Sequence, residues 1–261
     1  MSKLSFDDHQ PEKTSWEPVA KSYGKRIKED DSFQAGMVFP GALKLLAPLP
    51  GKKYLDIACG EGSFSALVAK LGAEVTGFDI SSSLIKSAEA KKIPGASFRV
   101  GNAKDFARYF GAGTFDGATC ILALQNINDL GAVIKDASSV LKPGASLVIV
   151  LNHPMFRIPR QSAWGWEEGR NLEYRRIDSY MTENEIPILA APSQGAKSVV
   201  TYSYHRPLEA YVRELSQNGF AITNLEEWTS NRFSDSGPRA KAENRARKEI
   251  PMFMAIRAKK M

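Results

Sequence analysis

The sequence of 261 residues predicts a doubly wound α/β domain, in which helices cover both faces of a parallel sheet. Between residues 53 and 151, short apolar runs alternate with stretches whose apolar residues recur at helical spacing. The run at 145–151 is almost continuously apolar, as is typical of strands that are buried on both faces. Strands and helices in this alternation indicate a sheet built from βαβ units.

Each expected element follows from its apolar period and from the residues that end it. The helix over 38–47 stops at residues 48–51 (PLPG), and the helix over 130–141 stops at residues 142–144 (KPG). The expected helices are 16–28, 38–47, 63–71, 82–91, 105–110, 130–141 and 207–218, and the expected strands are 53–57, 74–78, 97–100, 115–123, 145–151, 221–228 and 252–258.

The alternation breaks after residue 151. Residues 152–206 contain two stretches of strand-like period, 172–180 and 197–204, and a structureless loop of this length is uncommon in a compact domain. We therefore expect a β-element, inserted as a lid after strand five of a Rossmann-like sheet of seven strands. We expect one domain over 1–261, with a cap at 1–36, a binding core at 37–151, the lid at 152–206 and a closing helix and strands at 207–261.

Composition excludes several classes of protein. A hydrophobic content of 43% excludes a largely disordered chain, and the longest apolar run is far shorter than the ~20 residues that span a bilayer. The first residues contain no apolar signal segment. Cys59 and Cys120 lie 61 residues apart, which is no metal-ligand spacing, so we expect a cytoplasmic protein without a metal site.

The charge is locally rather than generally basic. There are 35 Lys and Arg residues against 29 Asp and Glu, a net charge of +6. Two segments, 157–176 and 239–248, carry five basic residues each, the second with Glu243 as its one acid. Such segments either attract anionic partners or form solvated loops, and both readings stay open.

Residues 54–64 (YLDIACGEGSF) are the stretch of the sequence that says most about ligand binding. A strand enters a glycine turn and then a helix, so the backbone at Gly60 and Gly62 is able to approach a ligand closely. Asp79 ends the next strand, nineteen residues after Gly60, where a carboxylate accepts ribose hydroxyls. A dinucleotide loop needs a third glycine, which is absent, and Asp56 would crowd a pyrophosphate but pair with an ammonium group. The sequence therefore favours a ligand with a ribose and an amino-acid part over NAD.

Residues 54–64, 77–81, 102–103, 115–127 and 140–150 together resemble the class I S-adenosylmethionine-dependent methyltransferases, close to the type 11 small-molecule group. The family usually has a glycine where this chain has Ala58. The resemblance implies S-adenosylmethionine as cofactor, S-adenosylhomocysteine as product and an S-adenosylmethionine-binding core at 37–151. The cofactor-binding residues that it implies are Asp56, Ala58, Cys59, Gly60 and Gly62 for the methionine part, Asp79 and Ile80 for the ribose side, Asn102 and Ala103 for the adenine, Ile121, Leu122 and Gln125 beside the sulfonium, and Tyr23 as a cover.

Structural roles remain as alternatives for several of these residues. Asp56 could be a helix-capping partner, Asn102 a turn residue and Asp79 an acid at a strand end. Tyr23 could serve packing alone, and both cysteines could be small buried fillers.

The acceptor is expected beyond the carboxyl ends of the strands, where ligands bind in open α/β sheets. Residues 152–156 (NHPMF) resemble the Asn-Pro-Pro-Tyr signature of amino-methyltransferases, but they follow strand five rather than strand four, which argues against nucleobase methylation. His153 or His205 is our hypothesis for a general base, with structural histidines as the alternative. The candidate substrate-binding residues of the lid are Arg157, Arg160, Trp164, Tyr180 and Tyr202, unless they form its own small core.

The sequence thus predicts an enzyme that transfers a methyl group to an oxygen or nitrogen atom of a small aromatic or anionic molecule. One alternative is an RNA-modifying methyltransferase that docks through the basic segment 239–248, although the modest charge disfavours nucleic acid. A second alternative is a non-catalytic protein that binds the cofactor or its product. We expect a monomer or a homodimer.

Overall fold

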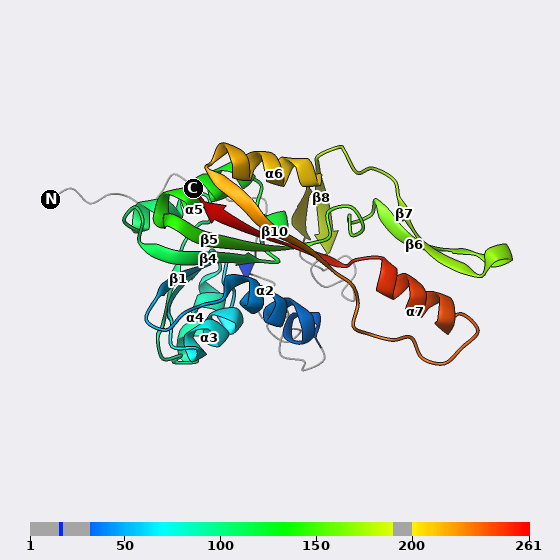
Figure 1. Cartoon of the computed structure of the whole chain (residues 1–261), viewed down its shortest axis with the longest axis horizontal. Helices are drawn as coiled ribbons and strands as arrows, with labels where there is room; N and C mark the ends of the chain where they lie inside the picture. The colour runs from blue at the N-terminus through cyan, green and yellow to red at the C-terminus, as the bar shows by residue number, and fades with distance from the viewer. Residues whose placement is uncertain (1–15, 18–31, 190–199) are drawn as a thin grey trace.

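A computed structural model of the chain describes residues 16–17, 32–189 and 200–261 (Figure 1). Apart from Trp16 and Glu17, the helix expected over 16–28 lies outside the described residues, and so does Tyr23. Within the described ranges, none of the helices combines the length and the apolar character needed to cross a bilayer.

The centre of the molecule is a seven-stranded sheet with the order β10-β11-β5-β4-β1-β2-β3. The strands β1 to β5 pair with one another in parallel. β11 runs antiparallel to both β5 and β10. This confirms the predicted α/β class and the seven strands. The strands are β1 (Lys53–Ile57), β2 (Glu74–Asp79), β3 (Ala96–Val100), β4 (Phe115–Ile121), β5 (Leu141–Asn152), β10 (Phe220–Trp228) and β11 (Phe253–Lys260).

Helices cover both faces of this sheet (Figure 1). On β5, Leu147, Ile149 and Leu151 belong to one buried cluster, and the alternate residues Val148 and Val150 belong to the other. A strand that is apolar on both faces is buried between two helical layers. One layer is α2 (Phe39–Leu46), α3 (Ser63–Lys70) and α4 (Ser82–Ala90), and the other is the 3₁₀-helix η3 (Phe106–Tyr109), α5 (Leu130–Val140) and α6 (Leu208–Gln217).

Several boundaries differ from the prediction for local reasons. The strand expected over 115–123 ends at Ile121, because Leu122 takes a left-handed conformation with φ of 53°. The helix expected over 38–47 is preceded by one π-helical turn, η2 (Gln34–Val38). The strand expected over 145–151 begins at Leu141, which pairs with Phe115 before the register shifts.

The insertion folds as two hairpins rather than as two strands. The predicted strand-like stretches correspond to β7 (Leu172–Ile177) and β9 (Val200–His205). Each pairs with a strand that was not predicted, β6 (Ser162–Glu167) or β8 (Asn184–Leu189). Gly165 and Pro187 explain the weak signal of the missed strands, because both residue types are depleted in strands.

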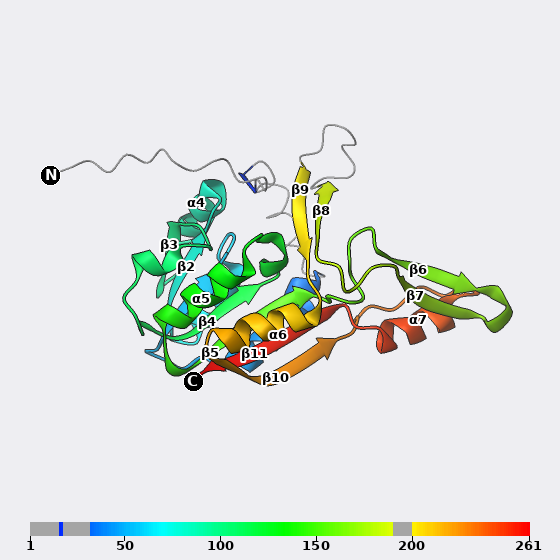
Figure 2. The same ribbon diagram turned by 90° about the horizontal axis from the view of Figure 1, so that it is seen from above.

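The β6–β7 hairpin projects from the sheet together with α7 (Ala240–Glu249) (Figure 2). This helix is the basic segment 239–248 of the sequence, and it lies against β7. The guanidinium of Arg239 lies 4.5 Å from the centre of the Trp166 ring. Part of the basic segment therefore stabilises this projection. The β8–β9 hairpin packs against the 3₁₀-helix η4 (Leu124–Asn126).

Candidate active site

A cavity opens at the carboxyl ends of β1, β2 and β4, at the place where open α/β sheets bind ligands. It contains most of the residues predicted to hold a cofactor. The lining residues are Trp16, Gln34, Phe39, Asp56, Ala58, Cys59, Gly60, Glu61, Ser63, Phe64, Phe78, Asp79, Ile80, Leu84, Gly101, Asn102, Ala103, Ile121, Leu122, Ala123, Asn126 and Ile127.

The glycine turn forms one wall of the cavity. Ala58, Gly60 and Gly62 all have positive φ, of 56°, 56° and 74°. This conformation suits glycine and strains Ala58, the position at which the sequence departs from the family pattern. Gly62 does not line the cavity. A Cβ on it would lie 2.6 Å from the ring of Phe98, so a glycine at this position lets the turn pack onto β3.

Asp79 joins the end of β2 to this turn. Its carboxylate accepts the backbone N–H groups of Gly60 and Ser81, each at 2.9 Å. Burial raises the pKa of Asp79, and the two hydrogen bonds act in the opposite direction. Each carboxylate oxygen has a second acceptor direction, so the group is able to accept ligand hydroxyls as well.

Asp56 is the second carboxylate of the cavity and is only 4% exposed. It accepts the hydroxyl of Ser65 at 2.6 Å and the hydroxyl of Thr119 at 2.9 Å. Burial raises its pKa to about 6, against the opposing effect of both hydroxyls. The two hydroxyl groups hold an acid whose charge changes near neutral pH, and a cationic ligand group would favour the ionised form.

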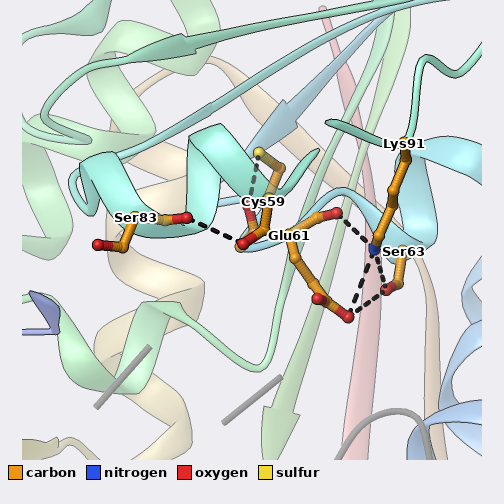
Figure 3. A network of polar contacts seen from close by, with 7 residues as sticks. Cys59, Glu61, Ser63, Ser83 and Lys91 are labelled. Atoms are coloured by element: carbon orange, nitrogen blue, oxygen red, sulfur yellow. Dashed lines mark hydrogen bonds and ion pairs between the residues drawn. The ribbon is translucent and has the colours of Figure 1, made fainter. Parts of the chain in front are cut away.

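A lysine that the sequence analysis did not identify stabilises the turn (Figure 3). The Nζ of Lys91, at the end of α4, donates to the carbonyl of Glu61 at 2.7 Å and lies 3.4 Å from its carboxylate. Ser63 donates its hydroxyl to the same carboxylate at 3.3 Å. Lys91 and Glu61 are thirty positions apart, and no sequence pattern relates the two positions. Their contact could therefore not be predicted from the sequence.

Trp16 and Glu17 lie against the same region from the amino-terminal side. The Glu17 carboxylate accepts the hydroxyls of Ser81 at 2.7 Å and Ser82 at 3.2 Å, and the backbone N–H of Ser83 at 3.1 Å. It also accepts the Ser83 hydroxyl, and this set of donors lowers the pKa of Glu17 to about 2. An acid at the amino terminus of α4 is favoured by the helix dipole. Glu17 therefore holds Trp16 in the cavity wall.

The wall nearest β4 is apolar and was predicted in part. Ile121 and Leu122 line it as expected, but Gln125 does not, because its Nε2 donates to the carbonyl of Leu122 at 2.8 Å. The next residues, Asn126 and Ile127, line the cavity instead. Arg206 lies behind them and donates to the carbonyls of Ile127 and Asn128, at 2.9 and 2.7 Å.

His153, one of the two histidines considered as a general base, does not line this cavity. Its Nδ1 accepts the backbone N–H groups of Met155 at 3.2 Å and Phe156 at 3.3 Å, so the proton is on Nε2. Nε2 lies 2.7 Å from the Glu227 carboxylate and donates to it. His153 is buried beside a second cavity, which Glu227, Met254 and Leu208 also line. Both ring nitrogens are therefore engaged in contacts within the protein.

His205 and the other lid candidates also lie outside the set of described residues that line the cavity. The Nε2 of His205 donates to the carbonyl of Tyr180 at 2.7 Å, and the Tyr180 hydroxyl accepts the N–H of Leu208 at 2.9 Å. Tyr180 and His205 therefore connect the start of α6 to the lid. Three further candidates lie on the lid surface or its strands: Arg160 is exposed, Trp164 is 45% exposed and Tyr202 is half-buried on β9.

The cavity fits a ligand with a sugar and an amino-acid part. Three buried carboxylates, those of Asp56, Glu61 and Asp79, line it. The aromatic or aliphatic residues Phe39, Phe64 and Ile121 form its apolar side. The left-handed turn at Gly60 leaves the backbone open to a ligand at the start of α3.

Comparison with known proteins agrees with this geometry. Residues 55–149 match the family model described as a methyltransferase domain. Residues 55–149 therefore correspond to a methyltransferase domain. The structure of an S-adenosylmethionine-dependent methyltransferase from Mesorhizobium loti superposes with a TM-score of 0.69, at 25% identity over 88% of this chain and 99% of that one. The resemblance predicted from the sequence motifs is confirmed.

More distant or partial matches add detail. A ubiquinone biosynthesis O-methyltransferase of Xanthomonas campestris is 36% identical over 104 residues, which cover 39% of this chain. The match spans 43% of that relative, less than half of its length. A geranyl diphosphate methyltransferase, solved in complex with GPP and sinefungin, shares the fold with a TM-score of 0.54 and 17% identity, over 86% of this chain and 77% of that one.

Proposed function

We propose that this chain is an S-adenosylmethionine-dependent methyltransferase that methylates an oxygen or nitrogen atom of a small aromatic or anionic molecule. The observation that carries the proposal is one cavity that combines the glycine turn and Asp79 with an apolar wall at Phe39, Ile121 and Leu122. The similarity of residues in the methyltransferase domain to O-methyltransferases of ubiquinone biosynthesis favours oxygen as the acceptor atom.

In this proposal, different residues of the cavity bind different parts of the cofactor. Bound S-adenosylmethionine supplies an electrophilic methyl group. In this proposal Asp79 accepts the ribose hydroxyls and Asp56 pairs with the ammonium group of the methionine part, and the position of both carboxylates in the cavity lining supports these roles. Asn102 and Ala103 lie at the adenine side, beyond β3.

The apolar wall serves the acceptor. Methyl transfer from a sulfonium is an in-line displacement, which depends on alignment of the reacting atoms and on exclusion of water. Phe39, Ile121 and Leu122 supply rigid apolar contact for that purpose. Because no histidine is among the described residues lining the cavity, we propose an acceptor that reacts without a histidine base, such as an acidic phenol.

The test is methyl transfer itself. Purified protein is incubated with S-adenosylmethionine carrying a labelled methyl group, together with catechols, phenols, aromatic amines and transfer RNA in separate reactions. We expect labelled product with a phenolic acceptor and none with RNA. Tight binding of S-adenosylhomocysteine without turnover on any acceptor would instead support the non-catalytic alternative.

A further inference from the structure

Arg157 lies at the base of the lid, five residues after the end of β5. The guanidinium of Arg157 lies 5.0 Å from the centre of the Phe253 ring, and the side chain is half-buried. Among the residues that the structure describes, no hydrogen bond or ion pair to this guanidinium is found. Burial lowers its pKa, and the positive charge of Arg175 lowers it further.

Arg175 is held beside Arg157 by contacts of its own. Its Nε donates to the carbonyl of Phe156, the residue before Arg157, at 2.7 Å. Its Nη2 donates to the hydroxyl of Ser162 at 2.9 Å, and its guanidinium lies 5.1 Å from the Trp164 ring centre. These contacts orient the group without neutralising it, and burial lowers its pKa as well.

Two other arginines of the lid are paired with carboxylates. Arg176 forms an ion pair with Asp178 at 2.8 Å, and Arg170 lies 3.6 Å from Glu167. Within the described part of the chain, by contrast, no carboxylate forms an ion pair with Arg157 or Arg175, so two guanidiniums leave positive potential in a partly desolvated place. An anion that binds there removes the repulsion and receives charge-assisted hydrogen bonds from planar groups that suit carboxylate and phosphate.

Aromatic packing connects Arg157 to the apolar cluster beside the cavity. The Phe253 ring under Arg157 packs edge-on against Phe33, with 6.0 Å between the ring centres. Phe33 precedes Gln34, which lines the cavity, and Phe253 belongs to the same apolar cluster as Ile121 and Leu122. Arg157 therefore lies behind the apolar packing that continues to the cavity wall, without lining the cavity itself.

We propose that Arg157 and Arg175 form an anion-binding subsite that takes a carboxylate or phosphate group of the acceptor molecule. This inference rests on the proposed function, and it narrows the acceptor to one with an anionic group some distance from the methylated atom. It also assigns a function to two of the five basic residues of segment 157–176, which the cofactor site does not require.

Calorimetry tests the subsite without turnover. The full-length protein, saturated with S-adenosylhomocysteine, is titrated with 4-hydroxybenzoate, with its neutral amide and with inorganic phosphate. We expect at least one of the two anions to bind, and an Arg157→Met variant to bind it about 10- to 100-fold more weakly, as for loss of a charge-assisted contact. Arg157→Lys should fall between the two. Arg176→Met, which removes an equal charge from the other face of β7, should bind it as the wild type does.

The outcomes separate the subsite from the proposed function. Failure of both anions to bind, or equal binding to wild type and Arg157→Met, overturns the subsite. A matched pair of acceptors, 3,4-dihydroxybenzoate and catechol, then tests turnover. If both are methylated with the same specificity constant, the subsite is wrong and the methyltransferase function stands. If the anion binds through Arg157 but no acceptor is methylated, the function is wrong and the anion site stands.

Discussion

The Asp79 carboxylate accepts the backbone N–H of Gly60 at 2.9 Å, so one side chain connects the end of β2 to the turn after β1. An Asp79→Asn variant replaces one acceptor oxygen with a donor and removes the charge. We expect the affinity for S-adenosylhomocysteine to fall about 10- to 100-fold, because charged hydrogen bonds contribute ~1.5–3 kcal/mol each. Calorimetry measures the dissociation constant directly.

The control for Asp79 is Asp116→Asn. That carboxylate forms an ion pair with Lys142 at 2.7 Å and accepts the N–H of Lys53, at the start of β1 and outside the cavity lining. Its replacement should leave the affinity unchanged. Equal affinities of wild type and Asp79→Asn would contradict the assignment of Asp79 to the ribose.

Asp56 is expected to make cofactor binding dependent on pH. Its pKa in the free protein is about 6, because burial opposes ionisation. A cationic ligand group favours the ionised carboxylate, so affinity should rise as the pH increases through about 6 and level off above it. Calorimetry between pH 5 and pH 8 gives the profile, and Asp56→Asn should bind more weakly with a flat profile. A wild-type profile equally flat would show that Asp56 does not face the ammonium group.

Glu17 is expected to support binding through Trp16. Replacing it with Gln removes the negative charge that strengthens the hydrogen bonds donated by Ser81 and Ser83. Trp16 is then no longer held in the cavity wall. We expect a several-fold weaker binding of S-adenosylhomocysteine in Glu17→Gln. Binding is followed by the quenching of tryptophan fluorescence on addition of S-adenosylhomocysteine. The part of this quenching that is absent in Trp16→Phe is due to Trp16. Unchanged quenching in Trp16→Phe would contradict the contact.

Most residues that the sequence predicted to hold a cofactor line one cavity, because their positions follow local rules. Gly60 belongs to a strand-turn-helix pattern and Asp79 ends the next strand, so parallel pairing brings them together. Glu17 and Ser83 lie 66 positions apart, and their contact depends on where the amino-terminal segment folds back. No periodicity encodes such a contact. The arginine pair at the lid base likewise forms through a hairpin whose first strand was not predicted.

The histidines illustrate the same limit of sequence reasoning. Position 153 lies at the mouth of the sheet, as expected from the end of β5, but the direction of its ring depends on Glu227, 74 residues later on β10. Histidine at a strand end is equally compatible with catalysis and with support of a turn. Only the partners of the two ring nitrogens distinguish these roles.

His153 is therefore expected to affect stability rather than turnover. His153→Ala leaves the N–H groups of Met155 and Phe156 without their acceptor and Glu227 without its donor. We expect a loss of about 2–4 kcal/mol in the free energy of unfolding, since unsatisfied buried groups cost ~1–3 kcal/mol each. Chemical denaturation measures this loss, while kcat of the folded fraction should stay within a few-fold of the wild type.

The pH dependence of stability provides a second test of the same role. Burial lowers the pKa of His153 despite the contact with Glu227, so the folded protein binds fewer protons at this site than the unfolded chain does. Its contribution to stability is therefore present above the unfolded pKa of about 6.5 and is lost as the pH falls below that value. His153→Ala should reduce this loss between pH 7 and pH 5. If the variant instead keeps its stability and loses turnover more than 100-fold, His153 acts in catalysis, and the supporting role assigned to it is wrong.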